Sequence, residues 1–133
     1  MKTHFLRLKK GDEAVSKIIE FCDQNSIESG WLSGLGAATS AQLAIYDLDK
    51  KEYFRKSIND ILEIGNLTGN ISKLDGKTIL HCHATLALSS FEAVAGHIDE
   101  LIIAATCEII IWETETKLTR KHDQEIGLNL LEL

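Results

Sequence analysis

Short runs in which apolar and polar residues alternate dominate this chain, and only one stretch has the spacing of a helix. From Glu13 to about Asn25 the apolar residues recur every three or four positions, which is typical of an amphipathic helix lying on a sheet. The rest alternates with a period of two or forms apolar runs bounded by turn residues, as strands do. One helix against many strands predicts an α+β fold: a mostly antiparallel β-sheet with one main amphipathic helix packed on it.

The alternating and apolar runs give the expected strands. They cover residues 4–8, 30–35, 41–47, 52–57, 61–72, 78–88, 102–113 with an interruption near Thr106, 118–121 and 128–131. Residues 90–95 are expected to form a short helical turn or a loop. Asp12 precedes the helix and is the expected N-cap, because its carboxylate can accept from the first backbone N–H groups. Gly34-Leu35-Gly36 lacks the Gly-Lys-Ser/Thr ending of a phosphate-binding loop and predicts a strand bend or a close backbone approach.

Length and composition predict one domain that covers residues 1–133. The 133 residues contain no proline, no internal repeat and no low-complexity segment. No apolar run approaches the roughly 20 residues that cross a bilayer, and no signal-peptide pattern follows Met1, so we expect a cytoplasmic protein with no membrane partner. The three cysteines are widely spaced, which favours reduced, buried thiols over a disulfide framework.

The charge balance disfavours nucleic acid as a direct partner. Lysine and arginine total 14 against 20 aspartates and glutamates, which gives a formal net charge of -6 at pH 7. Proteins that bind DNA through its phosphates need a basic surface, and the densest basic cluster here is only Arg7, Lys9 and Lys10. We therefore do not expect the chain to bind DNA by itself.

Three of the five histidines lie close together in the sequence and form the candidate site. His81 and His83 stand two apart in an expected strand, so they share one face while Cys82 points into the core. His97 follows in a nearby turn. Three imidazoles are the ligand set of an open metal site, for which Zn²⁺ is the leading candidate and another divalent transition metal the alternative.

The simplest competing interpretation is that these histidines are hydrogen-bonded strand residues with no ligand. If they do bind a metal, three imidazoles leave a coordination position for water or a ligand, but an enzyme would also need a general base and a pocket. Glu63 and Glu108 are the candidate carboxylates, and each can equally be an ordinary surface residue. Arg120 is a candidate for lining a pocket or a contact between subunits, or for a solvated pair with Asp123.

Several segments also resemble one family in order and spacing, the PPC (plants and prokaryotes conserved) domain. The segments that carry the resemblance are Ser33-Gly34-Leu35-Gly36-Ala37, Leu67-Thr68-Gly69-Asn70-Ile71, Asp75-Gly76-Lys77, His81-Cys82-His83-Ala84, Ala95-Gly96-His97-Ile98, Thr106-Cys107-Glu108-Ile109 and Leu118-Thr119-Arg120. Any one of them is weak evidence, but the ordered set covers nearly the whole chain.

The resemblance implies an antiparallel sheet with few helices, a homotrimer, and metal ligands at positions matching His81, His83 and His97. In flowering-plant members, AT-hook motifs outside the domain carry the DNA contacts, and this chain has no Arg-Gly-Arg core of such a motif. We therefore expect a metal-containing homotrimer that acts as a ligand-binding or regulatory module for an unknown small ligand. The alternatives are a DNA-binding protein like the AT-hook relatives, and a small metal-dependent enzyme of lyase or hydrolase type.

Overall fold

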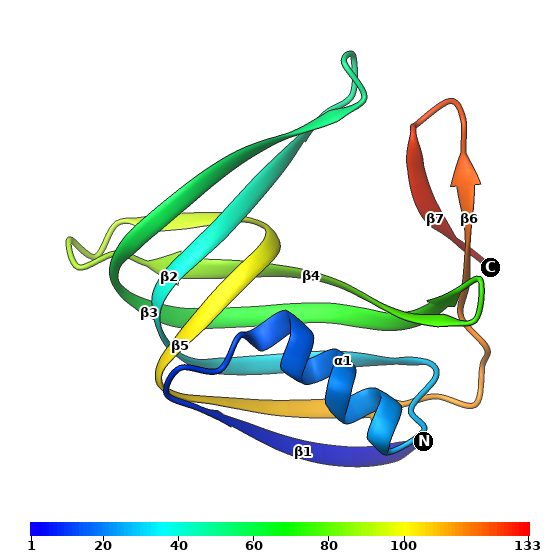
Figure 1. The fold of residues 1–133 in the computed structure, drawn as a ribbon, viewed down its shortest axis with the longest axis horizontal. Helices are drawn as coiled ribbons and strands as arrows, with labels where there is room; N and C mark the ends of the chain where they lie inside the picture. Colours follow the sequence, from blue (N-terminus) through cyan, green and yellow to red (C-terminus); the bar gives the residue numbers. More distant parts are fainter.

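The segments in which apolar and polar residues alternate form long strands in the computed structural model, which describes residues 1–133 (Figure 1). The elements are β1 (Lys2–Lys9), α1 (Ala14–Gln24), β2 (Gly30–Asp47), β3 (Glu52–Leu74), β4 (Lys77–Ala87), β5 (Ala93–Glu113), β6 (Thr119–Asp123) and β7 (Leu128–Glu132). The predicted class is confirmed, because one helix packs on a sheet whose pairings are antiparallel apart from a single parallel one, Lys73 with Thr119.

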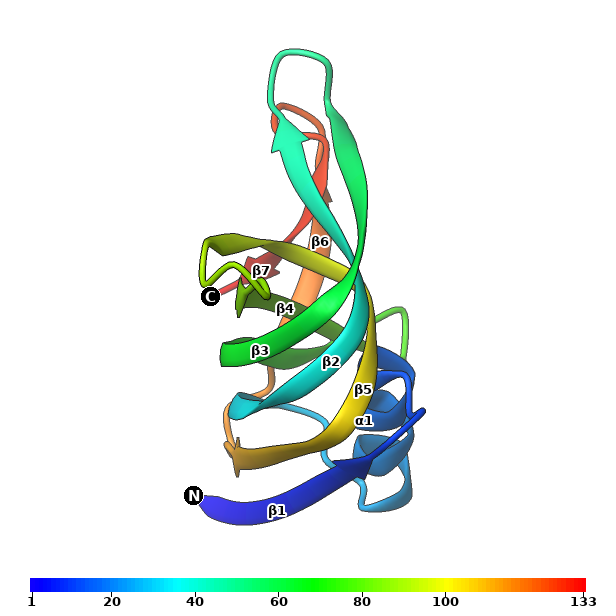
Figure 2. The same cartoon turned by 90° about the vertical axis from the view of Figure 1, so that its left-hand side faces the viewer.

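Four of the strands close into a ring of backbone pairings. The sheet order is β1-β5-β2-β3-β6-β7, and β4 pairs with both β3 and β5. Strand β5 begins beside β4, where Ala93–His97 pair with it, and then crosses to β2, where Ala44 is also a partner of His97. The bend of β5 between these two partners is visible in Figures 1 and 2. His97 therefore lies where three strands meet.

The strands are longer and fewer than the sequence runs predict. Segments 30–35 and 41–47 are one strand, β2, and segments 52–57 and 61–72 are one strand, β3. Strand β5 runs through Thr106 without a break and begins at Ala93, inside the segment expected to be a turn or loop. Strand β2 has register shifts between Gly34 and Gly36 and between Ala38 and Ser40. At these shifts the alternation of apolar and polar residues is interrupted, but β2 stays paired with its neighbouring strands on both sides of them.

Helix α1 begins one residue later than predicted. Its N-cap is Glu13, whose carboxylate accepts from the backbone N of Val15 (3.0 Å) and Ser16 (2.8 Å). The predicted cap, Asp12, accepts instead from the backbone N of Lys9 (2.9 Å), within the turn before the helix. Glu13 also accepts from Leu101 N (3.1 Å), so the cap joins the helix to β5.

The core lies between α1 and one face of the sheet. Ile18 and Cys22 of the helix are buried with Cys82 and Cys107 of the sheet, and all three cysteines of the chain are free and buried, as predicted. Burial raises the pKa of the Cys82 thiol to about 12, so this thiol stays protonated and inert at neutral pH. At 11 residues the helix is too short to span a membrane.

The β6–β7 hairpin stands beside the arm that β2 and β3 form past the body of the sheet (Figure 1). The Tyr46 hydroxyl donates to the carbonyl oxygen of Ile126 (2.6 Å), and Lys51 Nζ donates to that of Gln124 (2.9 Å). These bonds join the arm to the turn of the β6–β7 hairpin. The hairpin is thereby held on the face of the sheet that α1 does not cover.

Gly69 allows β3 to lie close to β4, the strand that carries His81 and His83. Gly69 pairs with Cys82, and a Cβ atom at this position would overlap the carbonyl oxygen of His81 and lie 2.7 Å from Cys82 Cβ. Since strand backbone and a buried side chain cannot yield cheaply, only glycine fits there.

We expect Gly69→Ala to lower the free energy of unfolding by about 1–3 kcal/mol, through overpacking of β3 against β4. Urea denaturation measures this directly. Gly65→Ala in the same strand is the matched control, because its nearest contact would be Thr85 O at 3.7 Å. Equal stability of the two variants would contradict the close approach at Gly69.

Candidate metal centre

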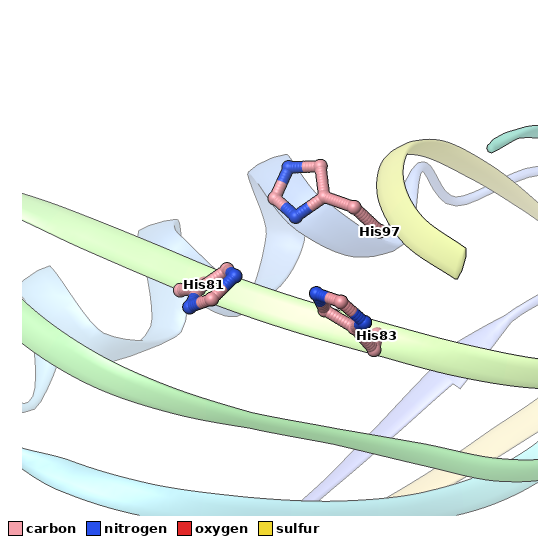
Figure 3. A group of neighbouring side chains, drawn as sticks. All are labelled: His81, His83 and His97. Atoms are coloured by element: carbon pink, nitrogen blue, oxygen red, sulfur yellow. The ribbon is translucent and has the colours of Figure 1, made fainter. Parts of the chain in front are cut away.

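The structure brings the three predicted histidines together on one side of the sheet. His81 and His83 project from the same face of β4, and Cys82 between them is buried on the other face. His97 is the direct partner of His83 in the β4–β5 pairing. The possible ligand nitrogens of the three rings lie within 4.8 Å of one another (Figure 3).

His97 has a buried nitrogen without a hydrogen-bond partner. Its Nδ1 atom is inaccessible to solvent and makes no hydrogen bond. On the other side of the ring, Asp99 Oδ1 lies 3.7 Å from Nε2, and Arg55 Nε holds this carboxylate by donating to Oδ2 (2.7 Å). Figure 3 shows one nitrogen of the His97 ring facing the other two imidazoles. An orphaned buried nitrogen is costly, and a metal ion is a partner that would satisfy it.

The surroundings of His81 and His97 favour the neutral form of both rings. Burial, together with the nearby Arg120, His97 and His83, lowers the pKa of His81 to about 4. Burial also lowers the pKa of His97, although Asp99 acts in the opposite direction. Neutral imidazoles carry the free lone pair that a metal ligand needs, so at neutral pH His81 and His97 do not have to lose a proton before coordination.

The donor set fits a transition metal. At zinc–nitrogen distances of about 2.0–2.1 Å, tetrahedral ligand nitrogens lie about 3.4 Å apart. The possible ligand nitrogens lie within 4.8 Å of one another, and the χ2 angle of histidine has a broad distribution, so the rings can turn toward a shared ion. Imidazole suits Zn²⁺, Cu²⁺, Fe²⁺ and Ni²⁺, and three protein ligands leave one tetrahedral position for water or a ligand.

A cavity of about 300 Å³ lies beside the histidines. Its polar lining consists of Tyr53, His81, His97, Arg120 and Asn129, and its apolar lining of Leu74, Ile79, Leu80, Leu128 and Leu130. The ring of Tyr53 stacks on that of His97 with centroids 5.2 Å apart. Arg120 thus lies beside the histidines, and it does not pair with Asp123, which accepts instead from Ile126 N (2.9 Å).

The two candidate glutamates lie elsewhere. Glu63 is exposed, and its partner in the β3–β4 pairing is Ala87. Ala87 is four residues beyond His83 on β4, so about 13 Å separates the two along the strand at the usual rise per residue. Glu108 is exposed on β5, eleven positions along the strand from His97, in a separate hollow that Phe5 and Leu35 also line. Neither carboxylate lines the cavity at the histidines.

Comparison with known families identifies the domain. A family model described as the Plants and Prokaryotes Conserved (PCC) domain matches residues 1–115. The chain belongs to this family. It is the family, also written PPC, that the sequence motifs resemble. A comparison with curated protein sequences finds no match.

Three solved structures place this PCC domain among relatives of the same fold. A protein from Archaeoglobus fulgidus described as metal-containing is 33% identical, with a TM-score of 0.93, and the match covers 100% of this chain and 94% of that one. A Bacteroides thetaiotaomicron protein described as a candidate DNA-binding protein is 29% identical (TM-score 0.94; 98% and 91% covered). A PPC protein from Pyrococcus horikoshii is 26% identical (TM-score 0.92; 100% and 92% covered).

Three residues at the site of this PCC domain were not predicted: Tyr53, Asp99 and Asn129. The spacing His97-x-Asp99 on a strand was a usable signal, because residues two apart share a face. Tyr53 and Asn129 come from segments far from the histidines in sequence. Only the register of β3 and the placement of the C-terminal hairpin bring them to the cavity.

Proposed function

We propose that this PCC domain is a metal protein in which His81, His83 and His97 hold zinc or another divalent transition metal. The observation that carries the proposal is the buried, unpartnered Nδ1 of His97, in a ring that lies against two further imidazoles. The description of the 33% identical Archaeoglobus fulgidus protein as metal-containing supports it. When bound, the metal would supply a Lewis-acidic position open to an exogenous oxygen or nitrogen donor.

A ligand-binding or regulatory module is the function that this site supports best. An enzyme of hydrolase or lyase type would use a general base near the metal, and Glu63 and Glu108 both lie away from the cavity. The nearest carboxylate, Asp99, is engaged by Arg55. The cavity can therefore hold a small molecule beside the metal, but it brings no free carboxylate to it.

Elemental analysis of protein purified without a metal-affinity step tests the metal. We expect about one equivalent of a transition metal per chain, and less than about a third of an equivalent in His83→Ala, because two imidazoles hold such an ion weakly. His83 is exposed, so its removal leaves the core intact. The matched control is His122→Ala, since His122 lies on β6 and bonds only Asn129 (3.2 Å).

Two results would overturn the metal proposal. One is a wild-type content below about a third of an equivalent. The other is the same content in wild type and His83→Ala, with circular dichroism showing that both variants are folded.

We also propose that the domain acts as a homotrimer. Phe5, Trp31, Leu35 and Ile110 form the outer face, the sheet surface opposite α1, where the pairing of β1, β5 and β2 sets them side by side. Phe5 is 78% exposed, Leu35 58% and Trp31 50%. Large apolar side chains exposed together on one face of a sheet mark an interaction site. The trimers implied by the family resemblance give it an occupant, further copies of this chain.

Sedimentation equilibrium tests the trimer. We expect the mass of three 14.8 kDa chains for the wild type. Leu35→Glu places a charge on the outer face and should shift the mass toward that of one chain, since burying an unpaired carboxylate is costly. Leu48→Glu, on the exposed turn of the arm, is the matched control. A monomeric wild type at micromolar concentrations would contradict this proposal.

DNA binding by the isolated domain has less support. The Bacteroides thetaiotaomicron relative is described as a candidate DNA-binding protein. This chain, however, carries a formal net charge of -6, and affinity for DNA comes largely from lysine and arginine at the phosphates. We therefore favour the metal site as the functional part of this domain.

A further inference from the structure

The cavity beside the histidines has a cationic end and an apolar wall. Its polar end carries the guanidinium of Arg120 together with His81 and His97. Five aliphatic side chains, together with Tyr53 and Asn129, make up the rest of the lining. At about 300 Å³ the cavity is of the size that holds a small metabolite. Its shape and lining thus suit a molecule with one polar end and a short apolar chain.

Arg120 is fixed in place by neutral acceptors. Its Nε donates to Ser72 Oγ (2.8 Å), one terminal nitrogen to Asn70 Oδ1 (2.7 Å) and the other to the carbonyl oxygen of Asn129 (2.7 Å). Ser72 and Asn70 are themselves buried. Since a guanidinium has five N–H groups, these bonds hold its position and leave two N–H groups for a ligand.

The charge of Arg120 has no anionic partner in the chain. No carboxylate forms an ion pair with it, and all three of its hydrogen-bond acceptors are neutral. Arg120 is nevertheless partly buried, and this burial lowers its pKa. A guanidinium removed from water without a counter-ion is unfavourable, so a preformed site of this kind is completed by an anion.

The proposed metal would add a second positive charge to the same cavity. Three neutral imidazoles leave the charge of a divalent ion unbalanced. The one carboxylate near these rings, Asp99, is already paired with Arg55. Both cationic centres therefore favour the same kind of ligand.

We propose that the cavity binds a small carboxylate with a short apolar chain, whose carboxylate lies on the two free N–H groups of Arg120. The apolar chain lies against the aliphatic wall that includes Leu74, Ile79 and Leu128. Planar, bidentate recognition of a carboxylate is what a guanidinium held in this way provides. The inference rests on the proposed function, since the metal supplies the second positive charge.

Calorimetric titration of the zinc-loaded protein with isovalerate tests the inference, and isovaleramide serves as the neutral analogue of the same shape. We expect isovalerate to bind at least about tenfold more tightly than the amide, because charge-assisted hydrogen bonds are the stronger ones. In Arg120→Gln this preference should be lost while the zinc content is unchanged. Lys121→Gln, which removes the neighbouring exposed cation, should bind like the wild type.

The outcomes separate the inference from the proposed function. A wild-type chain that takes up no zinc overturns the proposed function and the inference with it. A zinc-loaded chain that binds acid and amide equally, or an Arg120→Gln variant that keeps the preference, overturns the inference alone. Acetate or inorganic phosphate binding as tightly as isovalerate overturns the role of the apolar wall. The comparison of acid with amide needs only the wild type, so equal binding of the two overturns the inference even where Arg120→Gln does not fold.

Discussion

The pairing of β4 with β5 is the constraint on which the candidate site depends. It sets His83 opposite His97, and the alternation of side chains along β4 adds His81 on the same face. The same pairing closes the ring of β2, β3, β4 and β5, so the histidines sit on a framework with hydrogen bonds on all sides. A slip of one residue would turn His83 toward the core and Cys82 toward the cavity, at the cost of the buried packing of α1.

The second determinant is the way the C-terminal hairpin is attached. Arg120 of β6 satisfies two buried polar residues of β3, Asn70 and Ser72, and also bonds to Asn129 of β7. The hairpin is thereby fixed over the histidine face, and the aliphatic residues of β7 complete the cavity there. One arginine thus has a structural role and, in our proposal, leaves two donors for a ligand. A guanidinium can serve both roles because it has five N–H donors, whereas the ammonium group of lysine has three.

Much of the fold and part of the site could be predicted from the sequence, where local periodicity decides the outcome. The helix, the burial of Cys82 and the shared face of His81 and His83 all follow from spacing of 3.6 or 2 residues. The lengths of β2 and β3 and the cap at Glu13 were not predicted correctly, and the sequence left open whether Glu63 and Glu108 lie at the site or on the surface. Each of these depends on bulges and cross-strand register, which bring together residues far apart in the sequence and leave no periodic signal.

Anomalous diffraction from crystals of the protein, purified without a metal-affinity step, tests the central claim most directly. The account predicts one strong peak per chain, about 2.0–2.1 Å from one nitrogen of each of His81, His83 and His97. The nitrogen contributed by His97 should be Nδ1, which is buried and makes no hydrogen bond within the chain. The absence of a peak at the three imidazoles, or a metal bound elsewhere on the chain, would contradict the account.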